Sequence, residues 1–466
     1  MGNGFLLQIV FLINEWYSFF VKKKTHKYKE KGKRIRVYVL YTRKESRKVM
    51  TKKLNMAVCG ILVGTMAAGL GISSSAEEKV TLTYVTWNEN QRDSIQATVD
   101  GFEAENPDIE VEIQITPWGE YWTKLEAAAT SGNMPDIVTM HTNQVERYVN
   151  GGVLAELDDL AEYDESFSYD NYETGIADLY TYDGVHYGAP KDKDCVVLVY
   201  NKKLFDEAGV EYPNSDWTWE DLETAAEQLT DKENGIYGFN AYNNDQEGWG
   251  NFLYANGADF LNEDGTASGL DTAEAIEAME FYMGLNEKYS PSKEMQAEVD
   301  AVTMFATGTV AMQSIGNWQL SYFTDNETIK DDFALAMLPS TPEGNRATIS
   351  NGLALSIPKD CKNMEAAKKF VAYASSEKGM TEAASGPAIP CYNGVDEAWA
   401  QAHQDLYDTS VILDSLEYGK QLRGSEEKNE WGQIMYSYVG KIFDGSMNVE
   451  DAFTQASAEM NEVLAQ

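Results

Sequence analysis

Two short segments of the chain alternate regularly between hydrophobic and polar residues. Residues 80–87 place three apolar side chains on one face, and residues 109–115 carry an isoleucine or a valine at every second position. Alternation with a period of two predicts β-strands that bury one face. Between the two segments, apolar residues recur at helical spacing as far as Pro107. This pattern predicts a helix that ends before the proline.

The following segment, residues 131–157, extends the pattern into a β-α-β-α-β order. A helix predicted from about residue 119 ends at a Ser-Gly-Asn sequence, residues 131–133, and a short apolar strand follows at 137–140. A polar loop at 141–144 comes next. In an open parallel sheet, ligands bind beyond the carboxyl ends of the strands, so this loop is the first place to expect binding chemistry. The alternative interpretation is an ordinary buried strand followed by a solvated loop.

Further along the chain, other segments predict more of an α/β fold. The apolar run at residues 196–201 is typical of a fully buried strand. Thr218 followed three residues later by Asp221 indicates the start of a helix, with Thr218 as its N-cap. Residues 350–358 predict another strand, and the chain after Pro387 is mostly helical in pattern. No internal repeat is found.

Several of these segments resemble a known family. The sequence Ser-Gly-Asn-x-Pro-Asp-Ile at 131–137, with Gly-Gly-x-Leu-x-x-Leu at 151–157, is similar to the first lobe of extracellular solute-binding proteins of ABC importers. The most specific match runs from YGAP at 187–190 through YNKKLF at 200–205 to the Trp-rich segment around Thr218. Residues 308–318 add a match to the family's GxxAM and GxW motifs. The resemblance is to family 1, the sugar and oligosaccharide binders that include the maltose-binding proteins.

The resemblance implies a two-lobed α/β fold of the periplasmic-binding-protein type (type II), with a hinge between the lobes. Residues 80–193 and 350–386 are expected to form lobe 1, and residues 194–349 and 387–466 lobe 2. The chain would then cross between the lobes near residues 192–196 and again near residue 350.

Charge is distributed very unevenly along the 466 residues. Residues 1–53 hold 15 of the 37 Lys and Arg residues, whereas residues 1–76 hold only 3 of the 75 Asp and Glu residues. The remainder has 22 basic and 72 acidic groups, a formal net charge of −50. Such a field repels phosphate backbones and anionic lipids, which argues against nucleic-acid binding. It suits a secreted protein.

A signal peptide is predicted at residues 50–76. Met50 precedes a basic segment, residues 56–72 are apolar, and small residues at 74–76 suit cleavage. Residues 1–49 are interpreted as a probable upstream or untranslated extension. The alternative is a genuine apolar segment, residues 5–21, with a basic tail.

The cysteines indicate neither a lipid anchor nor a disulfide framework. Cys59 lies near the start of the apolar segment and lacks the small residue expected before a lipidated cysteine. Lipid anchoring is therefore not expected, and the protein is predicted to lie at the exterior of the cell envelope, on the extracellular face or in the periplasm. Cys195, Cys361 and Cys391 are interpreted as free thiols because their number is odd and their spacing suggests no pairing.

A carbohydrate site needs aromatic rings to cover the apolar face of a sugar, together with carboxylates and amides to bond its hydroxyls. Strand ends, polar loops and similarity to the family's sugar contacts select the following ligand-binding candidates: Trp87, Asn88, His141, Asn143, Gln144, Asp192, Asp194, Asn243, Glu247, Trp249, Asn317, Trp318, Asn351, Gly352 and Trp431. Trp318 is the leading aromatic candidate. Trp87 and Trp431 could instead be core residues, and Asp194 a hinge or surface acid.

These observations predict an extracellular receptor that captures a carbohydrate, most simply an oligosaccharide, and delivers it as a monomer to an ABC permease. No catalytic residue, metal site or cofactor is expected, because no nucleophile elbow, P-loop or metal-ligand spacing occurs. Two alternatives stay open: a secreted glycoside hydrolase with a carboxylate pair, and a binding protein for a cationic solute such as a polyamine. A cell-wall-binding module would show repeats or low-complexity linkers, and neither is found. The sequence does not identify the sugar.

Overall fold

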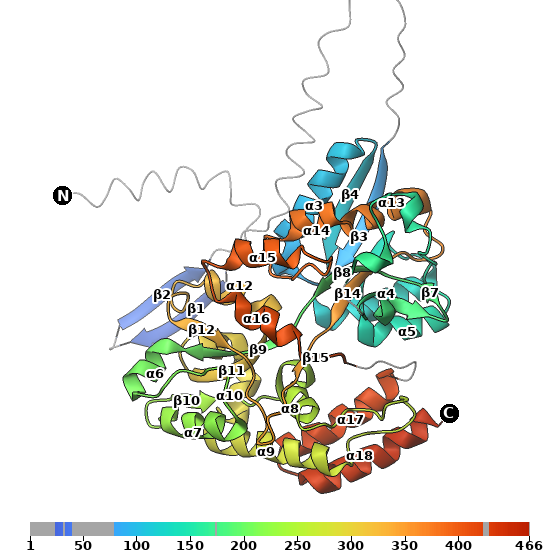
Figure 1. The fold of residues 1–466 in the computed structure, drawn as a ribbon. Coiled ribbons are helices and arrows are strands. Elements are labelled where there is room, and N and C mark those ends of the chain that lie inside the picture. The colour runs from blue at the N-terminus through green and yellow to red at the C-terminus, as the bar shows by residue number, and fades with distance from the viewer. Residues whose placement is uncertain (1–23, 31–32, 40–78, 173–174, 423–427, 466) are drawn as a thin grey trace, which may run out of the picture. The chain divides into compact units, whose positions relative to one another are not determined.

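The computed structural model describes residues 24–30, 33–39, 79–172, 175–422 and 428–465 (Figure 1). The chain divides into two units, Met1–Ala76 and Glu77–Gln466, which are described separately. In the first unit, strands β1 (Lys24–Glu30) and β2 (Lys33–Val39) pair antiparallel as a hairpin. The predicted signal peptide, residues 50–76, and the apolar segment at 5–21 lie outside the described residues.

The second unit contains two β-sheets, and the first has five strands in the order β4-β3-β5-β14-β8. Strand β3 pairs parallel with β4 and β5, whereas β14 is antiparallel to both β5 and β8. This confirms the predicted β-α-β-α-β order. The bounds are β3 (Val80–Thr86), α3 (Arg92–Glu105), β4 (Ile109–Ile115), α4 (Trp118–Ser131), β5 (Ile137–His141), α5 (Thr142–Asn150), β8 (Ala189–Lys193), β14 (Gly352–Ser356), α13 (Met364–Ala374) and α14 (Glu377–Ala383).

Helices cover both faces of this first sheet (Figure 1). On one face, the β3 side chains Leu82 and Tyr84 pack with Phe102 of α3 and Phe370 of α13. On the other face, Met140 of β5 packs with residues of α4 and α5. The alternating burial of β3 and the complete burial of β5 follow from their edge-proximal and central positions in the sheet. We call this sheet and its helices lobe 1.

The second sheet has four strands in the order β10-β11-β9-β12. Strand β9 lies between antiparallel neighbours, and all six of its residues are buried, as its apolar sequence predicts. The bounds are β9 (Val196–Asn201), α6 (Lys202–Ala208), α7 (Trp219–Leu229), β10 (Tyr237–Phe239), α8 (Gly250–Ala255), α9 (Ala273–Tyr289), α10 (Lys293–Glu298), α11 (Ala301–Ala306), β11 (Val310–Gly316), α12 (Ser321–Thr324) and β12 (Phe333–Ala336). We call this sheet and its helices lobe 2.

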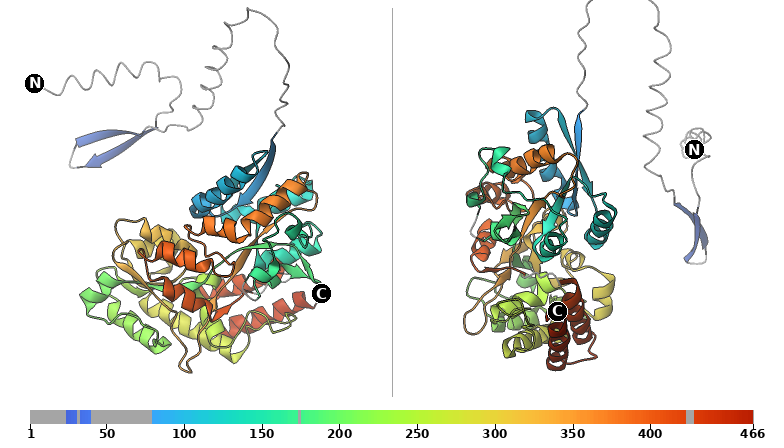
Figure 2. Two further views of the ribbon diagram at one scale, coloured as in Figure 1. Left: turned by 45° about the horizontal axis from the view of Figure 1, so that its top comes forward. Right: turned by 90° about the vertical axis from the view of Figure 1, so that its right-hand side faces the viewer.

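The remaining elements complete lobe 2 and the connections. Helices α15 (Asp396–His403) and α16 (Thr409–Leu416) pack against one face of the second sheet, whereas α17 (Lys428–Phe443) and α18 (Val449–Leu464) lie side by side near α9 (Figure 2). The short strand pairs are β6 (Thr181–Tyr182) with β7 (Val185–His186), and β13 (Thr348–Ile349) with β15 (Gly419–Lys420). The predicted N-cap of α7 is confirmed, because Thr218 and Asp221 form a reciprocal capping box.

The chain passes between the lobes at three segments, β8 to β9, β13 to β14 and the connection from α14 to α15, and the first two lie against each other. The Asp194 amide donates to the Asn351 carbonyl over 3.0 Å, and the Asn351 amide donates to Oδ1 of Asp194 over 2.8 Å. Nearby, the backbone amide and side-chain oxygen of Asn317 bond the backbone of Cys195. We call residues 193–196 and 349–352 the hinge segments.

Two tryptophans proposed as ligand contacts belong to the core of lobe 2. Trp249 and Trp431 are completely buried among the apolar side chains of α8, α9, α17 and α18. Neither ring can stack on a ligand in this conformation. For Trp431, the structure places the side chain in the core position that the sequence pattern left as the alternative.

Replacing Trp431 with alanine should lower the free energy of unfolding of the unliganded protein by about 3–5 kcal/mol, because the change leaves a large cavity in a packed core. Tyr322→Ala is the matched control, since that aromatic side chain is 52% exposed. Its effect should stay within about 0.5 kcal/mol. Urea unfolding followed by circular dichroism measures both. Equal stability of the two variants would contradict the core assignment.

Candidate functional site

A cavity of about 410 Å³ lies between the two lobes. Its volume is within the range of about 300–1,000 Å³ that is typical of small-molecule sites. Lobe 1 contributes the ends of β3, β5 and β8, and lobe 2 contributes the segment before α8, the segment after β11 and helix α17. The lining residues are Trp87, Asn88, Gln91, Trp118, His141, Asn143, Asp192, Lys193, Asp194, Asn244, Asp245, Gln246, Glu247, Trp318, Leu353, Ala388, Leu422 and Tyr436.

Eight of the fifteen residues selected from the sequence line this one cavity. They are Trp87, Asn88, His141, Asn143, Asp192, Asp194, Glu247 and Trp318. The positions come from distant parts of the chain and from both lobes. Their convergence follows from the sheet topology, which brings the carboxyl ends of β3 and β5 to one edge, beside β8.

The other selected residues do not line the cavity. Besides Trp249 and Trp431, these include Gln144, which lies half-buried in α5, and Asn243, which is exposed one residue before the lining segment 244–247. Asn317, Asn351 and Gly352 have structural contacts instead, as the next paragraph describes.

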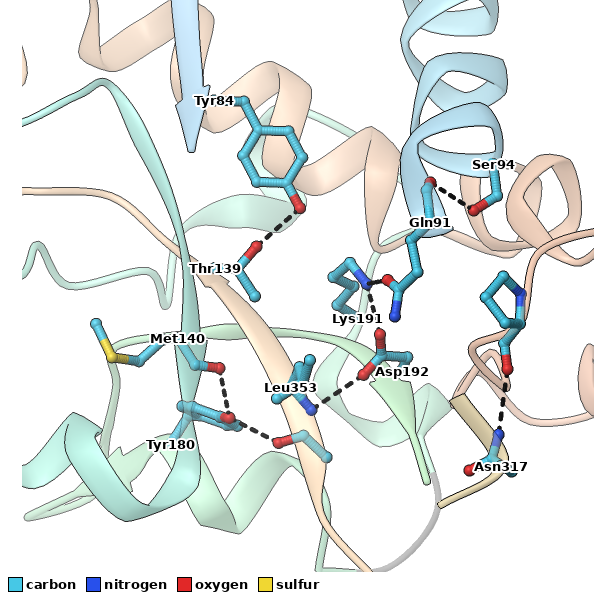
Figure 3. A network of polar contacts seen from close by, with 12 residues as sticks. Tyr84, Gln91, Ser94, Thr139, Met140, Tyr180, Lys191, Asp192, Asn317 and Leu353 are labelled. Atoms are coloured by element: carbon cyan, nitrogen blue, oxygen red, sulfur yellow. Dashed lines mark hydrogen bonds and ion pairs between the residues drawn. The ribbon is translucent and has the colours of Figure 1, made fainter. Parts of the chain in front are cut away.

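Asn317, Asn351 and Gly352 hold the lobe connections together. The Asn317 side chain is completely buried and donates to the carbonyl of Pro387 over 3.1 Å, in addition to accepting from Cys195. The Gly352 carbonyl accepts from the Tyr180 hydroxyl over 2.6 Å (Figure 3). In this conformation these residues shape the cavity from behind rather than face it.

Lobe 1 presents an aromatic cluster to the cavity. Trp87 and Trp118 meet edge to face with their ring centroids 5.0 Å apart, and Trp118 lies 5.6 Å from the ring of His141. Trp118 is 46% exposed, which is unusual for so large an apolar side chain. The sequence-based selection missed it, although Trp118 closely follows the end of β4 just as Trp87 follows the end of β3.

Trp318 brings an aromatic ring from lobe 2. Its ring lies against Gly316, where a Cβ atom would be only 2.1–2.3 Å from three carbons of the indole. Since real Cβ atoms do not approach other atoms so closely, any larger residue at position 316 would displace the ring. The half-buried ring can therefore occupy this position beside the cavity only because residue 316 is a glycine.

Glu247 fixes the segment that carries Trp318. Its Oε1 accepts from the Gly316 amide over 2.8 Å and from the Gln319 side chain, and its Oε2 accepts from the Tyr242 hydroxyl over 3.3 Å. Burial raises the pKa of Glu247 above its ordinary value, although these hydrogen bonds oppose the shift. The carboxyl group thus serves as an acceptor at the base of the cavity.

Asp192 and its neighbour Lys191 form an ion pair behind the cavity. Lys191 Nζ lies 2.5 Å from Asp192 Oδ2 and 2.8 Å from the side-chain oxygen of Gln91, and Asp192 Oδ1 accepts from the Leu353 amide (Figure 3). Burial alone would lower the pKa of Lys191, but the Asp192 carboxylate reverses the effect and the net shift is upward. The pair holds Gln91 and Asp192, both of which line the cavity.

Asp194 offers a second acid at the hinge. Burial raises its pKa well above the ordinary value, and the nearby carboxylates of Asp192 and Glu247 add to the shift, whereas the amide of Asn351 opposes it. Within the described part of the chain, no Lys or Arg pairs with Asp194 or Glu247. Lys193 also lines the cavity and pairs with Asp396 at 3.2 Å.

Tyr436 is a second aromatic lining residue, besides Trp118, that the sequence-based selection missed. Helix α17 brings this ring, 39% exposed, to the cavity, and its hydroxyl donates to Asp245 Oδ2 over 2.7 Å. Asn143 lines the cavity from the other lobe, lobe 1, and its side-chain oxygen has no hydrogen-bond partner within the described residues. The arrangement offers rings and acceptors from both lobes to one ligand.

No cluster suited to a metal ion accompanies these groups. Among the residues that the structure describes, no three His, Cys, Asp or Glu side chains gather in a way that could hold a metal. Over the same residues, no helix has the length and apolar character that a membrane span requires.

Comparisons with known proteins agree with this geometry. The family model described as "Bacterial extracellular solute-binding protein" matches residues 87–381. A maltooligosaccharide ABC transporter solute-binding lipoprotein of Streptococcus pneumoniae is 26% identical over 88% of this chain and 93% of its own length. An arabinooligosaccharide-binding protein of Halalkalibacterium halodurans is 26% identical over 66% of this chain and 70% of its own length.

A solved structure gives the same result for the fold. An ABC substrate-binding protein from Listeria monocytogenes, in complex with cycloalternan, superposes with a TM-score of 0.77 at 27% identity, covering 83% of this chain and 99% of its own. Other solved structures that superpose on this chain include the sugar-binding protein MalE of Xanthomonas citri and the maltose-bound MalE3 of T. maritima. The fold is therefore that of the type II periplasmic binding proteins, as predicted. With the family model covering more than half of the sequence, this chain belongs to the bacterial extracellular solute-binding proteins, a family of transport proteins rather than of enzymes.

Proposed function

We propose that this protein captures a carbohydrate, most simply an oligosaccharide, in the cavity between its lobes and delivers it to an ABC permease. One observation carries the proposal: rings from both lobes and a set of carboxylate and amide acceptors line the same cavity. The rings are Trp87 and Trp118 from lobe 1 and Trp318 and Tyr436 from lobe 2. Neither lobe alone supplies a complete site.

The chemistry of a sugar matches this lining. Aromatic rings cover its C–H faces, and acceptors such as Asn143, Asp194 and Asp245 bind its hydroxyl groups. An unmade bond to a buried polar group costs about 1–3 kcal/mol, so the acceptors select among sugars while the rings supply contact area. The named ligands of the relatives, maltooligosaccharide, arabinooligosaccharide and cycloalternan, support the same class.

The proposed mechanism is closure about the hinge segments. A ligand that touches both lobes binds the closed form better than the open form and shifts the population toward it. Converting a mostly open population into a mostly closed one requires about 5.5 kcal/mol of differential affinity. The four rings and the acceptors of the two lobes can meet in one ligand only when the lobes are closed, so they provide that difference. The closed shape is then what the permease recognises.

The proposal extends to the setting of the protein. It acts as a monomer outside the cytoplasm, at the exterior of the cell envelope, without catalytic turnover of the sugar. Asp194 and Glu247 act as hydroxyl acceptors in this scheme, not as an acid and nucleophile pair.

A panel of neutral, acidic and amino-containing oligosaccharides, together with polyamines, tests the proposal. We expect one or more oligosaccharides to raise the melting temperature of the purified protein and to be recovered intact. Shortened products would indicate a glycoside hydrolase, and stabilisation by a polyamine alone would indicate a receptor for cations. Either result would overturn the proposal.

Trp318→Ala should weaken binding of the ligand found in the panel at least tenfold while leaving the melting temperature of the free protein nearly unchanged. Stacking on an aromatic ring supplies contact energy, and this ring is only half-buried. Gly316→Ala should weaken binding in the same direction, because the added Cβ displaces the Trp318 ring. Isothermal titration calorimetry measures both. Gly284→Ala, at a helical glycine with open space around it, is the matched control and should bind normally.

Asp194→Asn should make the unliganded protein more stable at pH 7 while weakening ligand binding. An acid whose pKa is raised in the folded state binds its proton more readily when folded than when unfolded, so the free energy of unfolding falls as pH rises through that window. Asparagine removes this pH dependence and keeps an oxygen for the Asn351 amide. Denaturant unfolding from pH 4 to pH 8 measures the effect. A wild-type profile parallel to that of the variant would rule out the assigned role.

A further inference from the structure

Asn90 extends from one lobe to the other. It lies in the 3-10 turn Glu89–Gln91, which leads into α3 of lobe 1. Its side-chain Nδ2 donates to the Trp318 carbonyl over 2.5 Å and lies 3.5 Å from the Ser321 hydroxyl. Trp318 and Ser321 belong to lobe 2, in the turn after β11 and at the start of α12. This contact therefore joins the two lobes in this structure.

We propose that Asn90 is a latch: a positioning residue that holds the lobes closed over the ligand and sets how long the ligand stays bound. This inference rests on the proposed hinge closure and goes beyond it by assigning the closed state to a particular side chain. Asn90 does not line the cavity, so its effect on the ligand passes through Trp318.

The acceptor of the latch is well placed for such a role. The carbonyl of Trp318 belongs to the residue whose ring faces the cavity, and Glu247 holds the same segment from within lobe 2 through the Gly316 amide and the Gln319 side chain. The segment that carries the ring is therefore fixed on one side by its own lobe and on the other by Asn90. When the lobes separate, only the bonds within lobe 2 remain.

Acidic side chains of both lobes lie beside the Asn90 contact and oppose closure by repulsion. One hydrogen bond across the lobes therefore has a larger effect on the balance between the open and closed forms. A groove of about 650 Å³ beside the contact is lined by acids of both lobes, Glu89 and Asp93 from lobe 1 and Asp325 and Glu327 from lobe 2. Arg92 also lines the groove and pairs with Glu89 at 2.9 Å. Closure brings these like charges together, and the repulsion favours reopening. The uncharged amide of Asn90 forms a bond across this interface without adding to the repulsion.

The first experiment tests the contact without any ligand. In the double variant Asn90→Cys and Ser321→Cys, the thiols replace an amide nitrogen and a hydroxyl that lie 3.5 Å apart across the lobes, so a disulfide between them can form only when the lobes are closed. We expect the unliganded double variant to form an intramolecular disulfide on mild oxidation, seen by mass spectrometry after digestion, while either single variant does not. Absence of the 90–321 disulfide, with the ligand and without it, would overturn the latch.

The second experiment tests the effect of the Asn90 contact on ligand binding, and the probe is the oligosaccharide identified in the panel. Asn90→Ala and Asn90→Asp both remove the amide donor, and the aspartate keeps the shape. Each should raise the ligand off-rate about two- to tenfold, the value expected for one hydrogen bond, without changing the melting temperature of the free protein. Asn326→Ala is the matched control, because Asn326 lines the same groove but its side chain accepts only from Thr328 of its own lobe.

An off-rate of Asn90→Ala equal to that of the wild type and of Asn326→Ala would overturn the proposal. A lower melting temperature of the free variants would also overturn it, because Asn90 would then be a residue of fold stability. If no carbohydrate binds the wild-type protein, the proposed function fails, whereas disulfide formation between positions 90 and 321 still decides whether the lobes meet through this contact.

Discussion

The reciprocal hydrogen bonds between Asp194 and Asn351 tie together two of the three segments that join the lobes. One segment continues β8 of the first sheet into β9 of the second, and the other leads from β13, which pairs with β15, into β14 of the first sheet. Because the two segments are bonded to each other, they form one common pivot for the proposed closure of the lobes. The cavity lies directly beside this place, so its width depends on the angle at the hinge.

The carboxyl group of Asp194 has a structural role at the hinge and also borders the proposed ligand site. Asp194 lies at the hinge and also lines the cavity, where burial disfavours its charge. Glu247 has a comparable double role, since it holds the backbone of the segment 316–319 and borders the cavity. Such acids cost stability in the free protein, a cost that functional sites commonly show, because the groups are arranged for a ligand rather than for the unliganded fold.

Much of the fold could be predicted from the sequence, because the periodicity of apolar residues reports directly on burial. This holds for β3, β4, β5 and β9 and for the capping box at Thr218. The candidate site was only partly predictable. Around residue 247, a π-helical turn with Gly248 at φ −123° and ψ −118° directs Glu247 to the cavity and Trp249 into the core. Tyr436 lies on helix α17, whose packing within lobe 2, not its own sequence, decides which of its residues border the cavity.

The glycine beneath the indole ring of lobe 2 has a consequence for the thermodynamics of binding. A side chain that rotates freely must give up conformational entropy when it becomes ordered on a ligand, and this loss subtracts from affinity. Because position 316 has no Cβ atom, the Trp318 ring packs against the main chain there, and this contact restricts the rotamers open to the ring. The aromatic surface is thus preorganised, and the Trp318 side chain loses little further conformational entropy when a solute stacks on it.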